Sequence, residues 1–285
     1  MIGFSKRILK IFFKDRTSVL FSLLAVFIII GLYVFFLGDV WTDSFEDELE
    51  GTRYLMDSWI MAGLLAVTSA TTTMGAYGIM VDDKAKKINK DFVSSPIKNH
   101  SLVSGYVTGA ILIGIIMSLI TLALAELYIV SSGGELLAFP ALIKVLLLII
   151  LSTITNSSIL LFIVSFFKSN NAFATASTII GTLIGFLTGI YLPIGQLPDA
   201  VQWVVKCFPV SHAAALLRQV MMEVPMANTF SGAPAEAVTD FEKMMGVKFF
   251  FGSVELSPII SIIILVATAF IFYVLSILNL SRKHK

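Results

Sequence analysis

Six long apolar runs alternate with short polar segments along this chain. They cover residues 17–38, 58–81, 102–130, 139–167, 172–193 and 257–280, and their central stretches contain no Asp, Glu, Lys or Arg. A helix needs about 20 mostly apolar residues to cross a bilayer. The pattern therefore predicts an all-α membrane protein with six transmembrane helices.

The composition agrees with this pattern. Of the 285 residues 57% are hydrophobic and only 14% are charged, whereas a soluble domain has about 25% charged residues. The single cysteine, Cys207, excludes an intrachain disulfide and any cysteine-based metal cluster. The chain is predicted to be one transmembrane domain over residues 1–285.

The charges predict an orientation. An even number of spans puts both termini on one side, and that side carries fourteen of the twenty Lys and Arg but only four of the nineteen Asp and Glu. Lys and Arg accumulate in cytoplasmic loops. We therefore expect an integral protein of a bacterial cytoplasmic membrane with both termini in the cytoplasm.

The segment 1–16 has its own pattern. Phe4, Ile8, Ile11 and Phe12 recur at helical spacing, and most of the basic residues fall elsewhere on the helix. This arrangement is typical of an amphipathic helix lying in the membrane interface. The alternative is an ordinary basic flank of the first span.

A charged segment, residues 82–100, separates the second and third spans. Ala85, Ile88 and Phe92 would share one face of a helix there, and Pro96 would end it. Such a face favours docking into an apolar groove of a cytoplasmic partner, because a solvated connector has no need for it.

Hydroxyls and glycines stand out inside the spans. Thr68 and Thr72 belong to the run "TSATTT" and could either pack against helices or line a polar path. Gly181, Gly185 and Gly189 repeat every four residues, as do Gly105 and Gly109. Both runs indicate close helix packing, which could join two subunits, and the second and fifth spans are the candidate walls of a cavity.

The region 194–256, after the fifth span, is predicted to lie outside. Pro193 and Pro198 break the helix, and Trp203 suits the membrane interface. A short re-entrant helix would follow, and then, after Pro209, an amphipathic helix that carries Arg218. A further short helix is expected between Pro234 and Gly246.

Several chemistries have no motif here. The chain contains no G-x-x-x-x-G-K-[ST] and no H-E-x-x-H, and its three histidines are far apart. Ion-coupled carriers usually keep ionisable residues at membrane depth, whereas the central stretches of these spans hold only Ser, Thr, Asn and Tyr as polar residues. The absence disfavours an ion-coupled secondary transporter.

Together these features resemble the type-2, ABCG-like permeases of ATP-binding-cassette exporters. The resemblance rests on the topology and on two local patterns, Asp82-Asp83-Lys84 with Ile88, Phe92 and Ser95-Pro96-Ile97, and the series Pro193, Pro198, Pro209 and Arg218. The family often has Gly after the acidic cluster, where this chain has Lys86-Lys87.

The resemblance implies an exporter subunit that moves an amphipathic or hydrophobic cargo, such as a drug, peptide or lipid, by alternating access. It implies a second permease protomer and two P-loop ATPase subunits, which would bind ATP and Mg²⁺, with no cofactor and no nucleic acid on this chain. The residues implied in ATPase coupling are Asp83, Lys84, Lys87, Ile88, Asp91, Phe92 and Pro96. The alternatives are an ion-coupled secondary transporter and a membrane scaffold or immunity protein.

Overall fold

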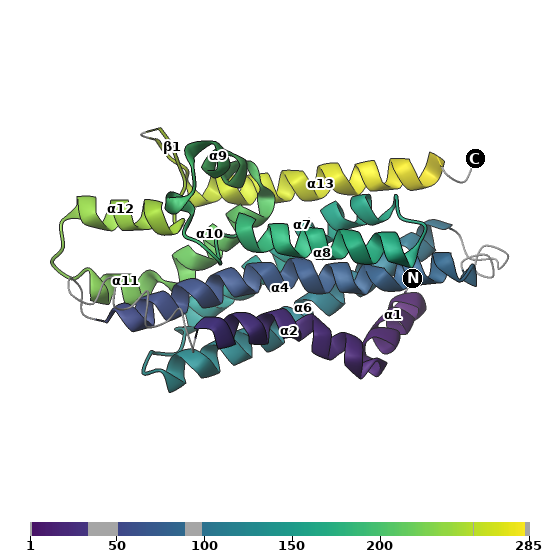
Figure 1. Ribbon diagram of the computed structural model, residues 1–285, viewed down its shortest axis with the longest axis horizontal. Coiled ribbons are helices and arrows are strands. Elements are labelled where there is room, and N and C mark those ends of the chain that lie inside the picture. Colours follow the sequence, from purple (N-terminus) through teal and green to yellow (C-terminus); the bar gives the residue numbers. More distant parts are fainter. Residues whose placement is uncertain (1, 34–50, 89–98, 253, 283–285) are drawn as a thin grey trace.

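The fold is a bundle of helices that run side by side along its long axis (Figure 1). The computed structural model describes residues 2–33, 51–88, 99–252 and 254–282. The longer helices are α1 (Ile2–Lys14), α2 (Arg16–Leu32), α4 (Thr52–Ala85), α6 (Asn99–Ser131), α7 (Phe139–Val164), α8 (Asn170–Leu187) and α13 (Pro258–Arg282). The remaining elements are η2 (Ile194–Gln196), α9 (Asp199–Cys207), α10 (Pro209–Met221), α11 (Glu223–Thr229), α12 (Ala235–Met245), β1 (Phe250–Phe251) and β2 (Val254–Glu255).

Helix α4 is the axis of the bundle. It contacts α2, α6, α7, α8 and α10, and 78% of its most apolar stretch is buried, against 17% in α13. Its hydroxyls fit this crowded position, because Thr68, Thr72 and Thr73 each bond to a carbonyl one turn earlier in their own helix. Asn156 of α7 donates to Ser69. The hydroxyl run of α4 therefore serves helix packing.

Each of the six predicted spans overlaps a helix, and residues 34–38 of the first span lie outside the described residues. Four described helices are long and apolar enough to cross a membrane, namely α4, α6, α7 and α13. The pairs α1–α2 and α9–α10, bent by 79° and 87°, would raise the number to six if each pair were one span. The fifth predicted span falls on α8, which opens with two asparagines and has 18 residues. The chain is thus an integral membrane protein, and the exact set of spans stays a prediction.

Helix α1 packs closely on α6. A Cβ atom added to Gly105 would lie 2.6 Å from Phe4, and one added to Gly109 would lie 2.8 Å from Ile8. The glycines of α6 therefore admit the apolar face of α1, and Ile8 and Phe12 are buried. The prediction of close packing at this pair is confirmed, but the contact lies within one chain. Most of the apolar face of α1 therefore packs against other helices of the same chain.

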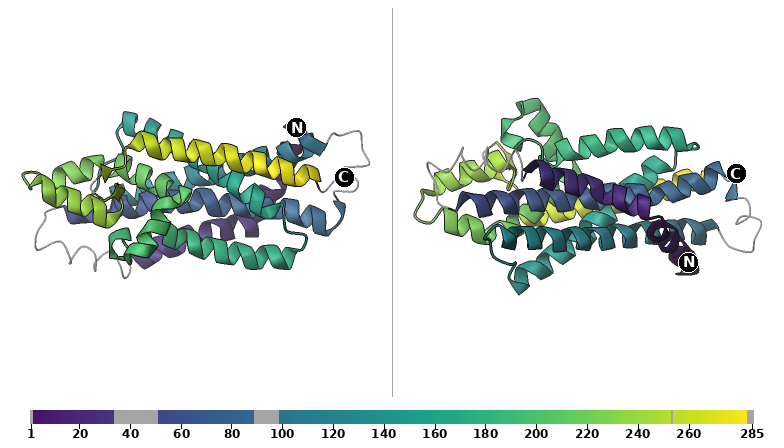
Figure 2. Two further views of the ribbon diagram at one scale, coloured as in Figure 1. Left: turned by 90° about the horizontal axis from the view of Figure 1, so that it is seen from above. Right: turned by 60° about the horizontal axis from the view of Figure 1, so that its bottom comes forward.

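The small elements gather at the end of the bundle opposite the chain termini (Figures 1 and 2). β1 and β2 form a short antiparallel pair. The helix expected after Pro234 is confirmed as α12, which ends at Gly246 with a left-handed φ of +64°. That conformation favours glycine at the end of a helix.

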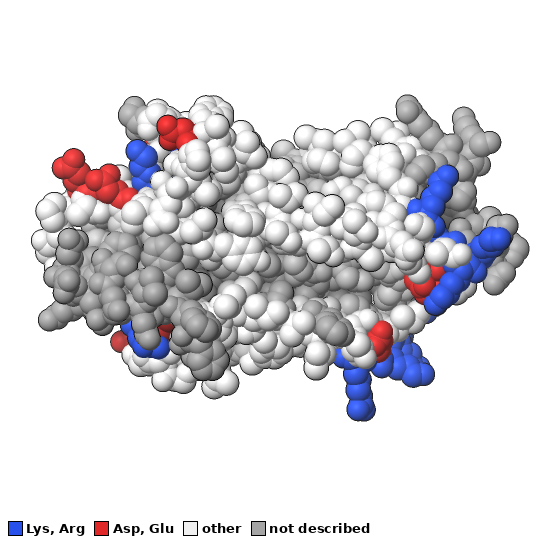
Figure 3. Space-filling view, viewed as in Figure 1, with Lys and Arg blue, Asp and Glu red and all other residues white. Residues whose placement is uncertain are grey.

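Charge is divided between the two ends of the bundle. Figure 3 shows Lys and Arg gathered at one end, while most of the Asp and Glu visible in this view lie at the other. Both ends of the described chain lie at the basic end (Figures 1 and 2). The fold thus brings the first helix, the end of α4, the start of α6 and the end of α13 to the same end.

We expect Gly109→Leu to lower the free energy of unfolding by about 2 kcal/mol, because the side chain overpacks the contact with Ile8. Gly181→Leu is the matched control, since a Cβ at Gly181 meets nothing within 4 Å. It should be neutral or stabilising, because Gly is a poor helix former. Equilibrium unfolding in mixed micelles measures both, and equal losses would contradict the packing described.

Candidate functional site

The basic end of the bundle is held together by one buried carboxylate, that of Asp83. Arg7 of α1 donates two hydrogen bonds to Asp83 of α4, at 2.8 Å to Oδ2 and 2.9 Å to Oδ1. The Tyr106 hydroxyl of α6 donates to the same Oδ2. Asp83 is 3% exposed. A buried carboxylate requires such a bidentate partner and further donors, so three helices are joined at this atom group.

The neighbouring carboxylate binds in another direction. Asp82 accepts from Asn170 at the start of α8, at 3.0 Å, and from Lys86, at 2.8 Å. The Asp82–Lys86 pair is partly exposed, so it contributes little stability on its own. Together, Asp82 and Asp83 connect the end of α4 to α1, α6 and α8. We call these two residues and their partners the acidic clamp.

The chain turns directly after the clamp. α4 ends at Ala85, and Lys87 adopts a left-handed φ of +61°. The predicted face shared by Ala85, Ile88 and Phe92 is therefore wrong for Ala85, which belongs to the last turn of α4. A left-handed conformation favours Gly, and the family that this chain resembles often has a Gly at this place. Lys84 lies in the last turn of α4, whereas Asp91, Phe92 and Pro96 lie outside the described residues.

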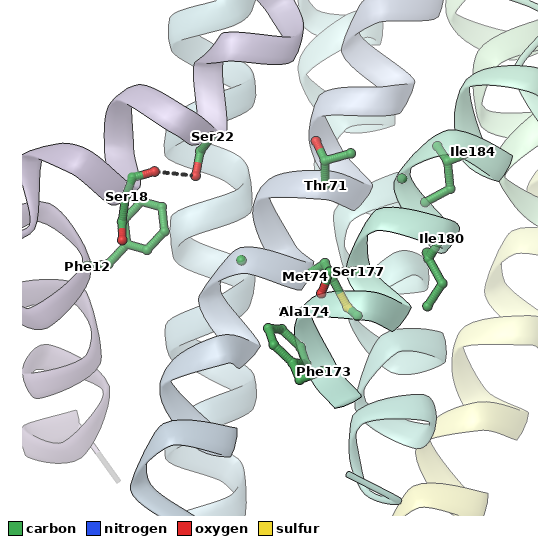
Figure 4. Close-up of a pocket in the computed structure, with 12 residues that line it drawn as sticks. Phe12, Ser18, Ser22, Thr71, Met74, Phe173, Ala174, Ser177, Ile180 and Ile184 are labelled. Carbon is green, nitrogen blue, oxygen red and sulfur yellow. Dashed lines mark hydrogen bonds between the residues drawn. The ribbon is translucent and has the colours of Figure 1, made fainter. Parts of the chain in front are cut away.

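A groove lies between α2, α4 and α8 (Figure 4). Its volume is about 350 Å³, within the range of small-molecule sites. Apolar side chains dominate the lining, and Ser18, Ser22, Thr71 and Ser177 add hydroxyls. The Ser177 oxygen is buried and has no hydrogen-bond partner among the described residues. The groove can therefore receive an apolar ligand that carries a few polar atoms.

The predicted cavity residues have separate positions. Gly181 lines the groove, whereas Thr68 and Thr72 are fully buried in the packing around α4. Gly185 accommodates the ring of Tyr191, and Gly189 turns the chain after α8 with a φ of +68°. Thr71 is the hydroxyl of the "TSATTT" run that lines the groove. Whether Gly181, Gly185 and Gly189 contact a second protomer stays a prediction.

The proline-bounded region forms two helices bent by 87°. Pro193 caps η2, Pro198 caps α9, and Pro209 opens α10. Trp203 on α9 is 60% exposed, which fits a position at a membrane interface. Lys248 lies between this region and α13. Burial lowers its pKa, but the neighbouring carboxylates of Glu242 and Glu255 raise it by more, so the pKa of Lys248 is above its usual value. The re-entrant placement of α9 stays a prediction.

Arg218 of α10 is the least expected member of this region. It is fully buried, with its guanidinium 4.4 Å from the ring centre of Trp59. None of its nitrogens has a hydrogen-bond partner among the described residues. The absence of a side chain at Gly63 leaves room for it, since a Cβ there would lie 3.1 Å from Nη2. A cation over an indole ring is held by the ring quadrupole.

These positions correct one expectation from sequence. The bundle does bury ionisable residues, because Asp57, Asp83 and Arg218 are each at most 3% exposed. α4 is longer than the predicted span 58–81, so it includes both aspartates. In the sequence Asp57 and Asp83 flank the apolar run 58–81, and nothing in that pattern indicates that they are buried. Within the described ranges no cluster of three His, Cys, Asp or Glu is placed to hold a metal ion.

Comparison with known proteins decides the family. The sequence profile of the ABC-2 family transporter proteins matches residues 39–278. The chain belongs to this family. It is also similar to nodulation protein J of Rhizobium meliloti, with 22% identity over 69% of this chain and 72% of the relative. Nodulation protein J of Bradyrhizobium diazoefficiens is 24% identical over 62% of this chain and 65% of the relative. The resemblance drawn from the sequence is thereby confirmed, and the chain is an ABC-2 permease.

We expect Asp83→Asn to lower the free energy of unfolding of this permease by about 2 kcal/mol, because Arg7 loses its charged partner in a buried site. Asp82→Asn is the matched control and should cost about 0.5 kcal/mol, since its ion pair is partly exposed. Equilibrium unfolding in mixed micelles measures both variants. Equal effects would show that Asp83 is no more structural than its neighbour.

Lys87→Gly should raise the free energy of unfolding by about 1 kcal/mol, because Gly adopts the left-handed conformation without a Cβ clash. Lys86→Gly removes the same charge from a right-handed position and should lower it by about 0.5 kcal/mol. The same unfolding assay applies. A stabilisation by both substitutions would assign the effect to charge and not to backbone conformation.

Proposed function

We propose that this chain is the membrane subunit of an ATP-driven exporter. It would act as a dimer, homomeric or with a similar permease, with two P-loop ATPase subunits at its basic, cytoplasmic end. ATP and Mg²⁺ would be bound by those partners. The family match supports a permease that works with an ATPase, and the division of charge between the two ends supports the orientation (Figure 3).

The observation that carries this proposal is the acidic clamp. α4 ends at Ala85, three residues after Asp82 and two after Asp83, and the connection to α6 begins there. A displacement of that connection would be transmitted to α1 and α6 through Asp83. It would be transmitted to α8 through Asp82. Helices α2, α4 and α8 enclose the groove. Movement driven by an ATPase would thus change the walls of a ligand site. Asp83 would act by positioning helices, because its oxygens are occupied inside the chain.

The groove supports an amphipathic or hydrophobic cargo. Its lining combines aromatic and aliphatic side chains with single hydroxyls, and it contains no charged residue. Outward transport by alternating access is part of the proposal and follows the resemblance to exporters. The relatives are called nodulation protein J, a name that states no cargo.

The double substitution Ile88→Asp and Phe92→Asp tests the site of ATPase attachment. Charges on the apolar positions should reduce co-purification of the ATPase about tenfold in mild detergent, which corresponds to 1.4 kcal/mol of binding. Lys90→Ser, which lies between them in sequence, is the control and should retain the partner. Unchanged co-purification by the double variant would contradict the attachment site.

A transport assay separates the proposal from an ion-coupled carrier. Efflux of an amphipathic dye from cells should stop when the ATPase is inactivated and should survive an uncoupler while ATP is maintained. The opposite pattern would assign the chain to the ion-coupled class. No dye transport under either condition, together with no ATPase on purification, would favour a scaffold.

A further inference from the structure

A second cavity lies beneath the elbow between α1 and α2. Its volume is about 410 Å³, and Arg7, Asp15, Asp82, Asp83 and Ile88 are among its lining residues. It shares Phe12, Ser18 and Gly75 with the groove between α2, α4 and α8. The two hollows therefore adjoin and form one channel, with charged residues at its basic end and apolar residues further into the bundle.

The two parts of this channel differ in chemistry. The inner part is lined by side chains such as Met74, Phe173 and Ile180, and Figure 4 shows residues of α4 and α8 around it. It holds no charge but contains the unpartnered Ser177 oxygen. The outer part is lined by three carboxylates and one guanidinium, and of these Asp83 and Arg7 are paired with each other. Only a ligand with an apolar chain and a polar head matches both parts.

The charges indicate what kind of head would bind. Asp15 is exposed, and its carboxylate, although it caps α2, keeps acceptor sites for a further donor. Lys14 and Arg16, both exposed, flank Asp15 in sequence. A phosphate would pair with these cations while an ammonium pairs with the carboxylates. An anionic head without an ammonium would pair with the same cations but would bring no donor to the carboxylate of Asp15.

We propose that this channel binds a zwitterionic aminophospholipid of the cytoplasmic leaflet, with its ammonium beside Asp15 and Asp82 and one acyl chain in the groove. One acyl chain would occupy the groove assigned above to the cargo, so this proposal rests on the proposed function and names a lipid class for that site. Binding of the lipid requires no ATPase, so a negative result would leave the proposed export role standing.

The test uses the purified full-length permease, without an ATPase, in nanodiscs. Phosphatidylethanolamine with a diazirine at the end of one acyl chain is photoactivated, and the modified residues are mapped by mass spectrometry. We expect labelling of α4 and α8 around Met74, Phe173 and Ile180. Phosphatidylglycerol with the same chain should label these positions about tenfold less, a difference equivalent to 1.4 kcal/mol.

Two substitutions separate the chain site from the head site. Gly75→Phe places a ring where the two cavities meet, and its Cβ would stand 3.7 Å from Ser22, an ordinary contact. It should abolish the α4 and α8 labels, whereas Gly31→Phe, at an open position that lines neither cavity, should not. Asp15→Asn keeps a capping residue but should reduce the preference for phosphatidylethanolamine.

Three results would overturn the proposal. The first is equal labelling by both lipids in the wild-type chain. The second is labelling confined to exposed α13 positions such as Ile263 and unchanged by Gly75→Phe. The third is a loss of self-association in Gly75→Phe with unaltered labelling, which would make the channel a contact between copies. A cooperative thermal unfolding transition like that of the wild-type chain establishes that each variant is folded.

Discussion

The ion pair between Arg7 and Asp83 is the constraint on which the basic end of this permease depends. A carboxylate at the end of an apolar helix is costly to bury unless charged and neutral donors surround it. Asp83 has two guanidinium hydrogen bonds and one phenol hydrogen bond. Because each donor comes from a different helix than its acceptor, the orientation of α1 and α6 relative to α4 follows from satisfying one side chain.

Glycine makes this arrangement sterically possible. α1 reaches Asp83 only because Gly105 and Gly109 let Phe4 and Ile8 approach the backbone of α6. Further along α4, Gly63 leaves room for the guanidinium of Arg218. The bundle thus buries charge where small residues allow close contact, and it leaves a hollow between α2, α4 and α8, where Gly75 and Gly181 are among the lining residues. Packing and cavity have the same origin, which is the distribution of small residues along the helices.

Much of this architecture follows from periodicity and turn chemistry. The apolar runs, the helix between Pro234 and Gly246 and the break at Pro198 are local features, and local sequence predicts them. The partners of buried polar groups are not local. Arg7 and Asp83 are separated by 76 positions, and Trp59 and Arg218 belong to elements with no shared motif. The glycine repeat of α8 was likewise ambiguous, because the same spacing gave an open wall at Gly181 and an intrachain contact at Gly185. Tertiary contacts decided each case.

The central claim is that a push on the connection after α4 is transmitted to the groove through Asp83. A distance measurement on the complex with its ATPase tests it most directly, with spin labels at Lys10→Cys on α1 and Thr175→Cys on α8 in a Cys207→Ser background. The account predicts that an ATP analogue shifts the α1–α8 distance in the otherwise wild-type chain, and that Asp83→Asn abolishes the shift while the ATPase stays bound. The same shift in Asp83→Asn would contradict it.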